Sequence, residues 1–297
     1  MSVCTHTLDT LGYELDEPGR PDPTQTTSYQ RSLARYLRGR VAAVDADIRE
    51  LIQDRRVFET DWAGLSTAQQ TRAFAEWLDQ EIDEVVLGAI ATDDRVHELL
   101  ESAARRGLVD GRASIRQAAR QPVDEGGLAT DELQALEAQL PDPERRLADR
   151  DVRQAIELER EELRQRVKSH MDDFAGDARQ IVSVGLVEAV GASTIVSDIV
   201  ERGQVAKSNV TASASAQIVN TFNERKVQDY WGEVEADLEI EPDVEYRTAG
   251  DQRVCELCLA LEGQEWTLED ASAFNIPGDT HNYCRCTFSV TQVSGVL

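Results

Sequence analysis

Residues 255–286 read CELCLALEGQEWTLEDASAFNIPGDTHNYCRC and hold four of the five cysteines of the chain. Two cysteines separated by two residues open the stretch, and a histidine and two further cysteines close it. A Cys-x2-Cys turn lets two thiolates approach one cation at about 2.3 Å each, and a distant second pair completes a tetrahedron. The stretch therefore predicts a small module whose two ends are joined by a metal ion.

The candidate ligands are Cys255, Cys258, His281, Cys284 and Cys286, five residues for four positions. Cys284 and Cys286 would point to the same face of an extended segment, so both could bind. Alternatively, His281 supplies a nitrogen and one cysteine stays outside the ligand set. The spacing leaves open a four-cysteine site and a site of three cysteines and one histidine. A surplus of ligands favours a closed, structural zinc site over a catalytic site with an open position. Two close cysteine pairs and a histidine also argue against a cluster of buried free thiols.

Motifs of common enzymes are missing from the sequence. The segment 97–101 reads HELLE and ends in glutamate where a zinc protease needs histidine. No His-x-Glu precedes the cysteines, as a zinc deaminase requires, and no Walker loop or dinucleotide fingerprint occurs. We therefore expect that the chain is not an enzyme. The alternative function is that of a zinc-dependent hydrolase or toxin-like enzyme, which would need an open metal position and a base.

Outside the cysteines, the period of the apolar residues changes near residue 243. Upstream they recur at three- and four-residue steps, typical of helices. Downstream, Val244, Tyr246 and Thr248 alternate as in a strand, and 265–268 and 287–291 are further strand candidates. Helices are expected at about 24–52, 66–91, 93–120, 130–139, 144–174, 177–190, 193–202 and 205–234.

These patterns predict a mainly α fold, an extended helical body with a small C-terminal α+β zinc-binding module. The expected parts are an irregular N-terminal arm, 1–23, with three prolines, the helical body, 24–242, and the zinc-stapled module, 243–297. A module this small buries too little apolar surface to be stable alone, so the metal would supply part of its folding energy.

The charge of the chain is strongly acidic. Lys and Arg total 31 against 56 Asp and Glu, a net charge of −25, and only three residues are lysines. Such a composition indicates adaptation to molar salt, where the Debye length falls to about 3 Å and carboxylate repulsion is screened. Because phosphate binding needs positive surface, the chain is a poor candidate for coating DNA. Any contact with DNA is expected to be local or indirect.

Other features restrict location and partners. No apolar run approaches 18 residues, so no membrane span is expected. The N-terminal MSVCTH lacks the basic and apolar regions of a secretion signal, and disulfides would need an oxidising compartment. Residues 20–56 carry eight arginines against five acids, a local charge of +3. The charged side chains of this predicted helix form either a solvated face or a docking surface for an acidic partner.

A nucleic-acid-binding zinc finger is a third functional class, and the charge of the module argues against it. Residues 243–297 hold three arginines and nine acidic residues, a net charge of −6. Such a surface would repel phosphate.

The stretch 248–258, TAGDQRVCELC, resembles the signature of the Mu-F-like minor head proteins of tailed viruses. The resemblance continues through LEG at 261–263, LEDA at 268–271, Pro277 and HNYCRC at 281–286. Upstream, DPTQTT at 22–27 before an arginine-rich helix is similar to the usual opening of the family. The Arg-Thr-Glu segment found in many members is absent here.

The resemblance implies a protein carried in the virion head in a few copies, assembled in the host cytoplasm and located in the capsid interior or at the portal vertex. Its implied partners are the portal protein or the major capsid protein, and its implied role is in head assembly, genome packaging or ejection. Together with the salt-adapted composition, it predicts a tailed virus of a halophilic host.

Overall fold

The structure, a computed structural model, describes residues 24–53, 62, 64–238, 240–250, 254–280 and 284–295. The predicted N-terminal arm, 1–23, therefore lies outside the described residues. The chain divides into two compact units, which are described separately. The sheet unit comprises Met1–Arg31, His97–Glu159 and Ser215–Leu297, and the helical unit comprises Ser32–Val96 and Arg160–Ala214. The predicted boundary between residues 242 and 243 stays a prediction.

Most of the described residues are helical, and one small sheet lies near the C-terminus, which confirms the mainly α prediction. Among the described residues, no helix combines the length and the apolar character that a membrane span needs. The helices are α1 (Thr27–Gln53), α2 (Thr67–Ile82), α3 (Gly88–Thr92), α4 (Asp94–Ala119), α5 (Thr130–Gln139), α6 (Pro143–Ala148), α7 (Arg150–Val187), α8 (Ala192–Glu224), α9 (Gly232–Leu238), α10 (Glu256–Leu261) and α11 (Leu268–Ala273), with π-helical turns η3 (Asp83–Leu87) and η5 (Arg225–Trp231) and a 3-10 turn η4 (Val123–Glu125).

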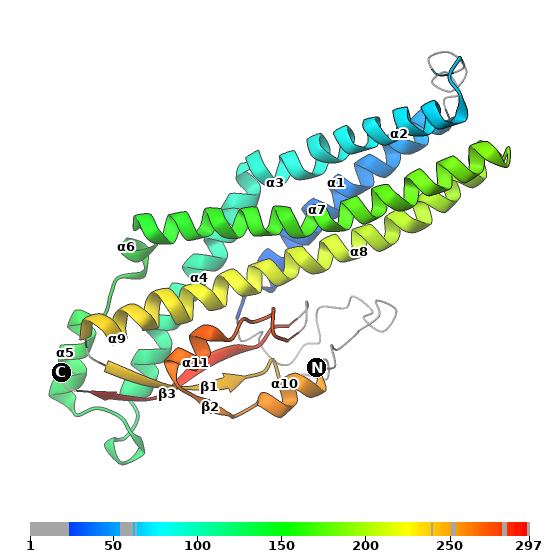
Figure 1. Cartoon of the computed structure of the whole chain (residues 1–297). Coiled ribbons are helices and arrows are strands. Elements are labelled where there is room, and N and C mark those ends of the chain that lie inside the picture. The colour runs from blue at the N-terminus through cyan, green and yellow to red at the C-terminus, as the bar shows by residue number, and fades with distance from the viewer. Residues whose placement is uncertain are drawn as a thin grey trace. The chain divides into compact units, whose positions relative to one another are not determined.

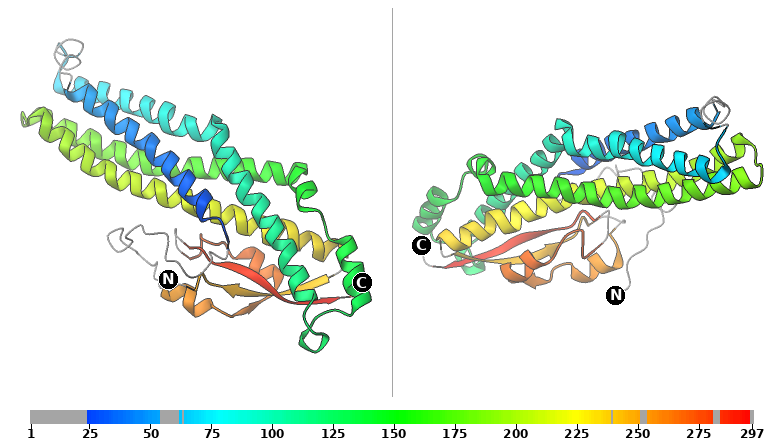
Figure 2. Two further views of the ribbon diagram at one scale, coloured as in Figure 1. Left: turned by 180° about the vertical axis from the view of Figure 1, so that it is seen from behind. Right: turned by 45° about the horizontal axis from the view of Figure 1, so that its top comes forward.

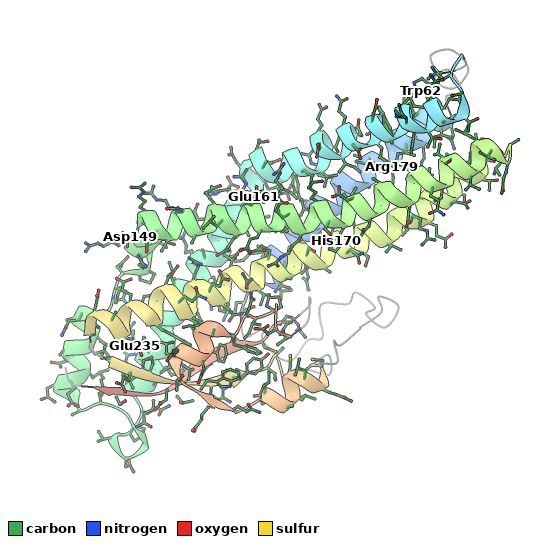
Figure 3. The ribbon with its side chains drawn as sticks, in the orientation of Figure 1. Trp62, Asp149, Glu161, His170, Arg179 and Glu235 are labelled. Carbon is green, nitrogen blue, oxygen red and sulfur yellow. The ribbon has the colours of Figure 1, made fainter. Side chains whose placement is uncertain are left out.

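The helical unit is built from parts of α1, α2, α7 and α8, which run alongside one another in both views of Figure 2. Leu37, Val44 and Ile48 recur at helical spacing on α1 and are fully buried. Polar contacts join neighbouring helices: Arg179 of α7, labelled in Figure 3, pairs with Asp79 of α2. A stripe of aliphatic side chains on each helix therefore forms the core of this unit.

Two predicted helix breaks are wrong. The expected helices 144–174 and 177–190 are joined in α7, and those at 193–202 and 205–234 are joined through α8, η5 and α9. A glycine alone costs a helix only about 1 kcal/mol, which packing readily offsets. Gly203 has a packing role, because a Cβ there would lie 2.5 Å from the Asp45 carboxylate of α1.

The sheet unit contains a three-stranded antiparallel sheet in the order β2-β1-β3 (Figure 1). Its strands are β1 (Ile240–Arg247), β2 (Glu265–Trp266) and β3 (Thr287–Gly295), so all three predicted strands are confirmed. The central strand, β1, alternates buried and exposed side chains, and a register shift falls between Asp243 and Val244. Buried positions on one face of β1 include Val244 and Tyr246.

The core of the sheet is aromatic. Tyr246, Trp266, Phe274 and Phe288 form a cluster whose ring centroids are 5.0–6.3 Å apart, mostly edge to face. Each such pair contributes about 0.5–1.5 kcal/mol to stability beyond the contribution from burying its surface area. Four contacting rings from β1, β2, β3 and the segment after α11 therefore fix the strands against one another.

Helix α8 and turn η5 bring buried charge to this unit. Lys226 is almost completely buried, and its ammonium pairs with Asp110 of α4 at 2.7 Å and donates to the Phe288 carbonyl of β3. Arg225 is buried between Glu159, Glu224 and Asp229. Burial raises the pKa of Glu159 to about 8, although Arg225 acts to lower it. These pairs tie α8 and η5 to α4, α7 and β3 within the sheet unit.

Candidate metal centre

The cysteines lie at the two places where the module changes from loop to regular structure. Cys255 is the N-cap of α10, with extended backbone, and its Sγ accepts the backbone N–H of Cys258 at 3.4 Å. Cys258 follows in the first turn of α10, and Cys284 and Cys286 immediately precede β3. Local helix capping and strand pairing thus present both cysteine pairs to the same side of β1.

Three thiols meet at this point. The Sγ atoms of Cys258, Cys284 and Cys286 all lie within 4.8 Å of one another, and all three residues are buried. The Cys258 and Cys284 sulfurs are 3.7 Å apart. Sulfurs at the corners of a regular tetrahedron about 2.3 Å from its centre lie about 3.8 Å apart, the separation a zinc thiolate site requires. The donor set and its spacing therefore fit a tetrahedral metal ion.

The two remaining candidate ligands, Cys255 and His281, are not part of this group of three thiols. Cys255 is buried, but its Sγ lies outside the 4.8 Å group of three. His281 lies outside the described residues. The choice between a four-cysteine site and a site of three cysteines and one histidine therefore stays open, and the five-residue ligand set stays a prediction.

Tyr246 also belongs to the site, although the sequence pattern did not predict this role for it. Its hydroxyl donates to the Cys258 Sγ at 3.5 Å and lies 3.8 Å from the Cys284 Sγ. A further N–H, that of Cys286, donates to the Cys284 Sγ at 3.5 Å. Hydrogen bonds to thiolate sulfurs orient them and stabilise their charge in metal sites. The alternation at 244, 246 and 248 predicts that Tyr246 lies on the buried face of its strand, and this was the only hint in the sequence that it could reach the cysteines.

Neighbouring thiols and burial both act on the pKa values of this group. The pKa of Cys258 is raised far above its usual range, chiefly by its contact with the Cys284 thiol and also by burial. Contact with Cys258 lowers the pKa of Cys286, but the Cys284 thiol and burial outweigh it and raise that pKa to about 12. Neighbouring thiols in a dry site resist ionisation unless a cation lies among them. A bound divalent cation reverses this preference and deprotonates its thiol ligands.

The segment that carries Cys284 and Cys286 is fastened to the helices. The side-chain amide of Asn223, on α8, donates to the Cys286 carbonyl at 3.2 Å. Three residues after Asn223, the Lys226 ammonium contacts the Thr287 hydroxyl at 3.3 Å and the Phe288 carbonyl. The backbone leading from the cysteines into β3 is therefore held by buried side chains, which preorganises the thiols for a metal.

Comparisons with known proteins agree with this arrangement. Residues 160–289 match the family described as Phage Mu protein F like protein. The matched segment runs from within α7 through α8 and the sheet to the start of β3, and it includes all five candidate ligands. Comparison with curated proteins and with solved structures gave no match. The resemblance detected in the cysteine motif is confirmed, because residues 160–289 of the chain are similar to the Mu protein F-like family.

Proposed function

We propose that this protein is a minor head protein of a tailed virus that associates with the portal or the inner capsid and assists head assembly, genome packaging or ejection. The family match supports a role in phage head morphogenesis and a place in the virion. It carries the proposal because it covers most of α7, all of α8 and the cysteine module together, rather than a cysteine motif alone.

We propose that the metal has a structural role and that the chain is not an enzyme. Zinc held by Cys258, Cys284, Cys286 and a fourth ligand would join α10 to the start of β3, with Tyr246 orienting the thiolates. Its chemistry there is to neutralise the thiolate charge and to close the module. The three thiols of the group, Cys258, Cys284 and Cys286, are buried, which favours a closed site over one that exchanges water and substrate.

The proposed docking surface for other head components is the outer face of α1. Arg35, Arg38 and Arg49 are exposed on this helix, opposite its buried apolar stripe. In a chain of net charge −25, a row of exposed arginines is the surface best suited to an acidic partner. The remainder of the arginine-rich stretch, 20–23 and 54–56, lies outside the described residues.

We also propose that the virus infects a halophilic host. The acidic residues outnumber the basic ones by 56 to 31, and only three of the basic residues are lysines. This balance suits molar salt, where screening removes most of the repulsion between surface carboxylates.

The test is the composition of virions made with variants of the protein. Replacing Arg35, Arg38 and Arg49 together by glutamate should reduce its incorporation at least about tenfold, as quantified by mass spectrometry against the major capsid protein. The control reverses Arg145, Arg150 and Arg153, which are exposed on α6 and α7, and should leave incorporation unchanged. Circular dichroism checks that both proteins fold.

Two outcomes would contradict the proposal at different levels. Absence of the unmodified protein from purified virions would refute the head-protein function itself. Equal incorporation of both triple variants would refute the docking role of α1 and leave the head-protein function standing.

A further inference from the structure

Helix α1 carries two positive charges that no other described residue neutralises. Arg35 and Arg38 lie one helical turn apart, are exposed, and form no ion pair with any part of the chain that the structure describes. Residues 32–44 hold three arginines and no acidic residue, and the third arginine, Arg40, is already paired with Asp93. In the left view of Figure 2, α1 lies in front of the other helices of its unit. Two unpaired guanidinium groups therefore face outward from this unit.

The helix surface beside these arginines is flat. Gly39, Ala42 and Ala46 follow one another at steps of three and four residues, and all three are exposed. A Cβ atom added at Gly39 would have no other atom within 4 Å, so this part of the surface is open. Because such small side chains let another backbone approach closely, this face of α1 suits a partner that is itself flat, such as a β-sheet.

The outer face of the sheet has the opposite charge. The alternation of β1 places Glu241, Asp243 and Glu245 on the side opposite its buried residues. Glu265 of β2 lies directly opposite Glu245 in the strand register. Arg247, at the end of the same row, pairs with Glu245 at 3.0 Å. One guanidinium and four carboxylates give this face a net charge of 1 − 4 = −3.

Most of these carboxylates have no counter-charge among the described residues. Glu241, Asp243 and Glu265 form no ion pair there. Like charges directly opposite each other on neighbouring strands destabilise the pairing, and Arg247 contacts only one of the two. The surrounding segment supplies little positive charge, since residues 215–297 hold five basic and 16 acidic residues, a net charge of −11. A positive surface from outside the chain would therefore stabilise this face.

The two faces match in spacing as well as in charge. Side chains three positions apart on a helix have Cβ atoms about 5–6 Å apart. Alternate residues of a strand are about 6.6–6.8 Å apart, and directly opposed residues of two strands are about 4.5–5.5 Å apart. Arg35 and Arg38 of one copy can therefore meet two carboxylates of another copy at the same time, each as a bidentate pair.

We propose that α1 of one copy of this chain docks on the outer sheet face of a second copy. The proposal rests on the docking role proposed above for α1 and names the partner of that surface. A second copy matches both unpaired faces at once, whereas a nucleic acid would match α1 and leave the carboxylates of the sheet unpaired. Two chains of charge −25 repel each other at a distance. At 0.15 M salt the screening length is about 8 Å, so the facing surfaces decide the outcome.

Such a contact joins the copies head to tail. Each added copy leaves one α1 and one sheet face available, so the assembly closes into a ring or continues as a chain. A contact of a few ion pairs is small and polar, which is typical of weak, transient interfaces. At 0.15 M NaCl the full-length, metal-loaded protein should self-associate with a Kd of about 10 μM, measured by sedimentation equilibrium. At 1 M NaCl, where ion pairs at an exposed interface are screened, the Kd should rise at least about tenfold.

The decisive test reverses the charge of each face. Arg35→Glu with Arg38→Glu should weaken self-association at least about tenfold, and so should Glu241→Arg with Asp243→Arg. Each double variant presents two faces of like charge, so it should not associate alone. An equimolar mixture of the two should associate within about threefold of the unmodified protein, because each reversed face then meets its complement. Recovery on mixing also shows that both variants are folded.

The control reverses two other exposed arginines, Arg150→Glu with Arg153→Glu on α7, and changes the net charge by the same amount. It should associate like the unmodified protein. An equal loss of association in this control would mean that net charge alone governs association, and it would overturn the proposal.

The proposal would also fail if the unmodified protein stayed monomeric up to about 1 mM, or if the mixture of reversed variants did not associate. Binding of a DNA duplex that Arg35→Glu with Arg38→Glu abolishes, in a protein that stays monomeric, would assign α1 to nucleic acid instead. The outcome is separate from that of the virion test. Loss of incorporation without self-association would overturn the second copy as partner and leave the head-protein function standing. Self-association of a protein that is absent from virions would do the reverse.

Discussion

The helical unit and the sheet unit each contain a lysine that is largely shielded from solvent, and they hold it by different means. In the helical unit, Lys207 of α8 forms an ion pair with Asp45 of α1, and no other partner for its ammonium is found among the described residues. In the sheet unit, Lys226 has Asp110, the Thr287 hydroxyl, the Phe288 carbonyl and two aromatic rings around its ammonium. One lysine depends on a single carboxylate, and the other is held by a network.

The hydrophobic cores of the two units also differ in how many groups share the stabilisation. Aliphatic side chains repeated along α1, α2, α7 and α8 form the core of the helical unit, so each residue contributes a small share. The module of the sheet unit rests on four aromatic rings and a cluster of cysteines between short strands. Stability is therefore distributed in the helical unit and concentrated at a few groups in the module. Removal of one group should have unequal consequences in the two units.

Metal removal should have the largest effect, and it should be confined to the sheet unit. Structural zinc contributes apparent binding energies of about 10–16 kcal/mol in small domains. A strong chelator added to the full-length protein should remove one equivalent of zinc. Hydrogen exchange should then show loss of protection in residues 240–295, while 160–187 stay protected.

Serine variants separate the ligands from the other cysteines. Cys258→Ser should reproduce the effect of the chelator, whereas Cys4→Ser, a change in the only cysteine outside residues 255–286, should retain the metal. Cys255→Ser and His281→Asn, compared with each other, should identify the fourth ligand by which of them lowers the zinc content. A metal content well below half an equivalent in the unmodified protein would contradict the structural metal.

The sequence predicted the module better than the helices. The alternation at 244, 246 and 248 is a local property with a period of two, and β1 follows it. The helix breaks near residues 175 and 203 were wrong because they were inferred from local composition. Whether a glycine interrupts a helix depends on its neighbours in space, such as the Asp45 carboxylate that lies against Gly203.

The same distinction applies to the candidate site. Cysteine spacing alone was enough to bring Cys258, Cys284 and Cys286 together, because a metal motif encodes its own geometry. Asn223 and Lys226 could not be assigned from sequence, because they reach the β3 segment from more than 60 positions away in the chain.

An intermediate effect is expected from removing the partners of the buried lysines. Asp45→Ala leaves Lys207 buried and unpaired, so it should cost about 3–5 kcal/mol of unfolding free energy. The double variant with Lys207→Met removes both charges and should cost less than half as much. Asp110→Ala should also cost less, because Lys226 keeps a hydroxyl, a carbonyl and two rings. Urea unfolding followed by circular dichroism measures all three.

Two results would break this part of the comparison. Equal losses for Asp45→Ala and for the double variant would mean that lost packing, and not a stranded charge, destabilises the helical unit. A larger loss for Asp110→Ala than for Asp45→Ala would mean that the network around Lys226 does not compensate for its carboxylate.

Salt should have the smallest effect, and it should again fall on the two units unequally. Residues 215–297, the longest segment of the sheet unit, carry a net charge of −11. The whole helical unit, Ser32–Val96 and Arg160–Ala214, holds 15 basic and 21 acidic residues, a net charge of −6. Dilution from 1 M to 0.1 M salt lengthens the screening distance from about 3 Å to about 10 Å, so neighbouring carboxylates begin to repel one another. Self-repulsion destabilises the compact state most where net charge is densest.

We therefore expect dilution to lower the unfolding free energy of the sheet unit by about 1–2 kcal/mol, which corresponds to a few interactions between exposed charges. The unfolding free energy of the helical unit should fall by less. Bound metal should mask part of this loss, because its ligands are held independently of surface screening. The measurement is hydrogen exchange at 1 M and at 0.1 M NaCl, with and without chelator, comparing peptides from 215–295 with those from 160–214. Potassium chloride at the same concentrations is the control for a specific sodium effect and should give the same result. If protection in both segments is independent of salt, carboxylate repulsion is already balanced within the fold, and the proposal of a halophilic host loses its physical basis.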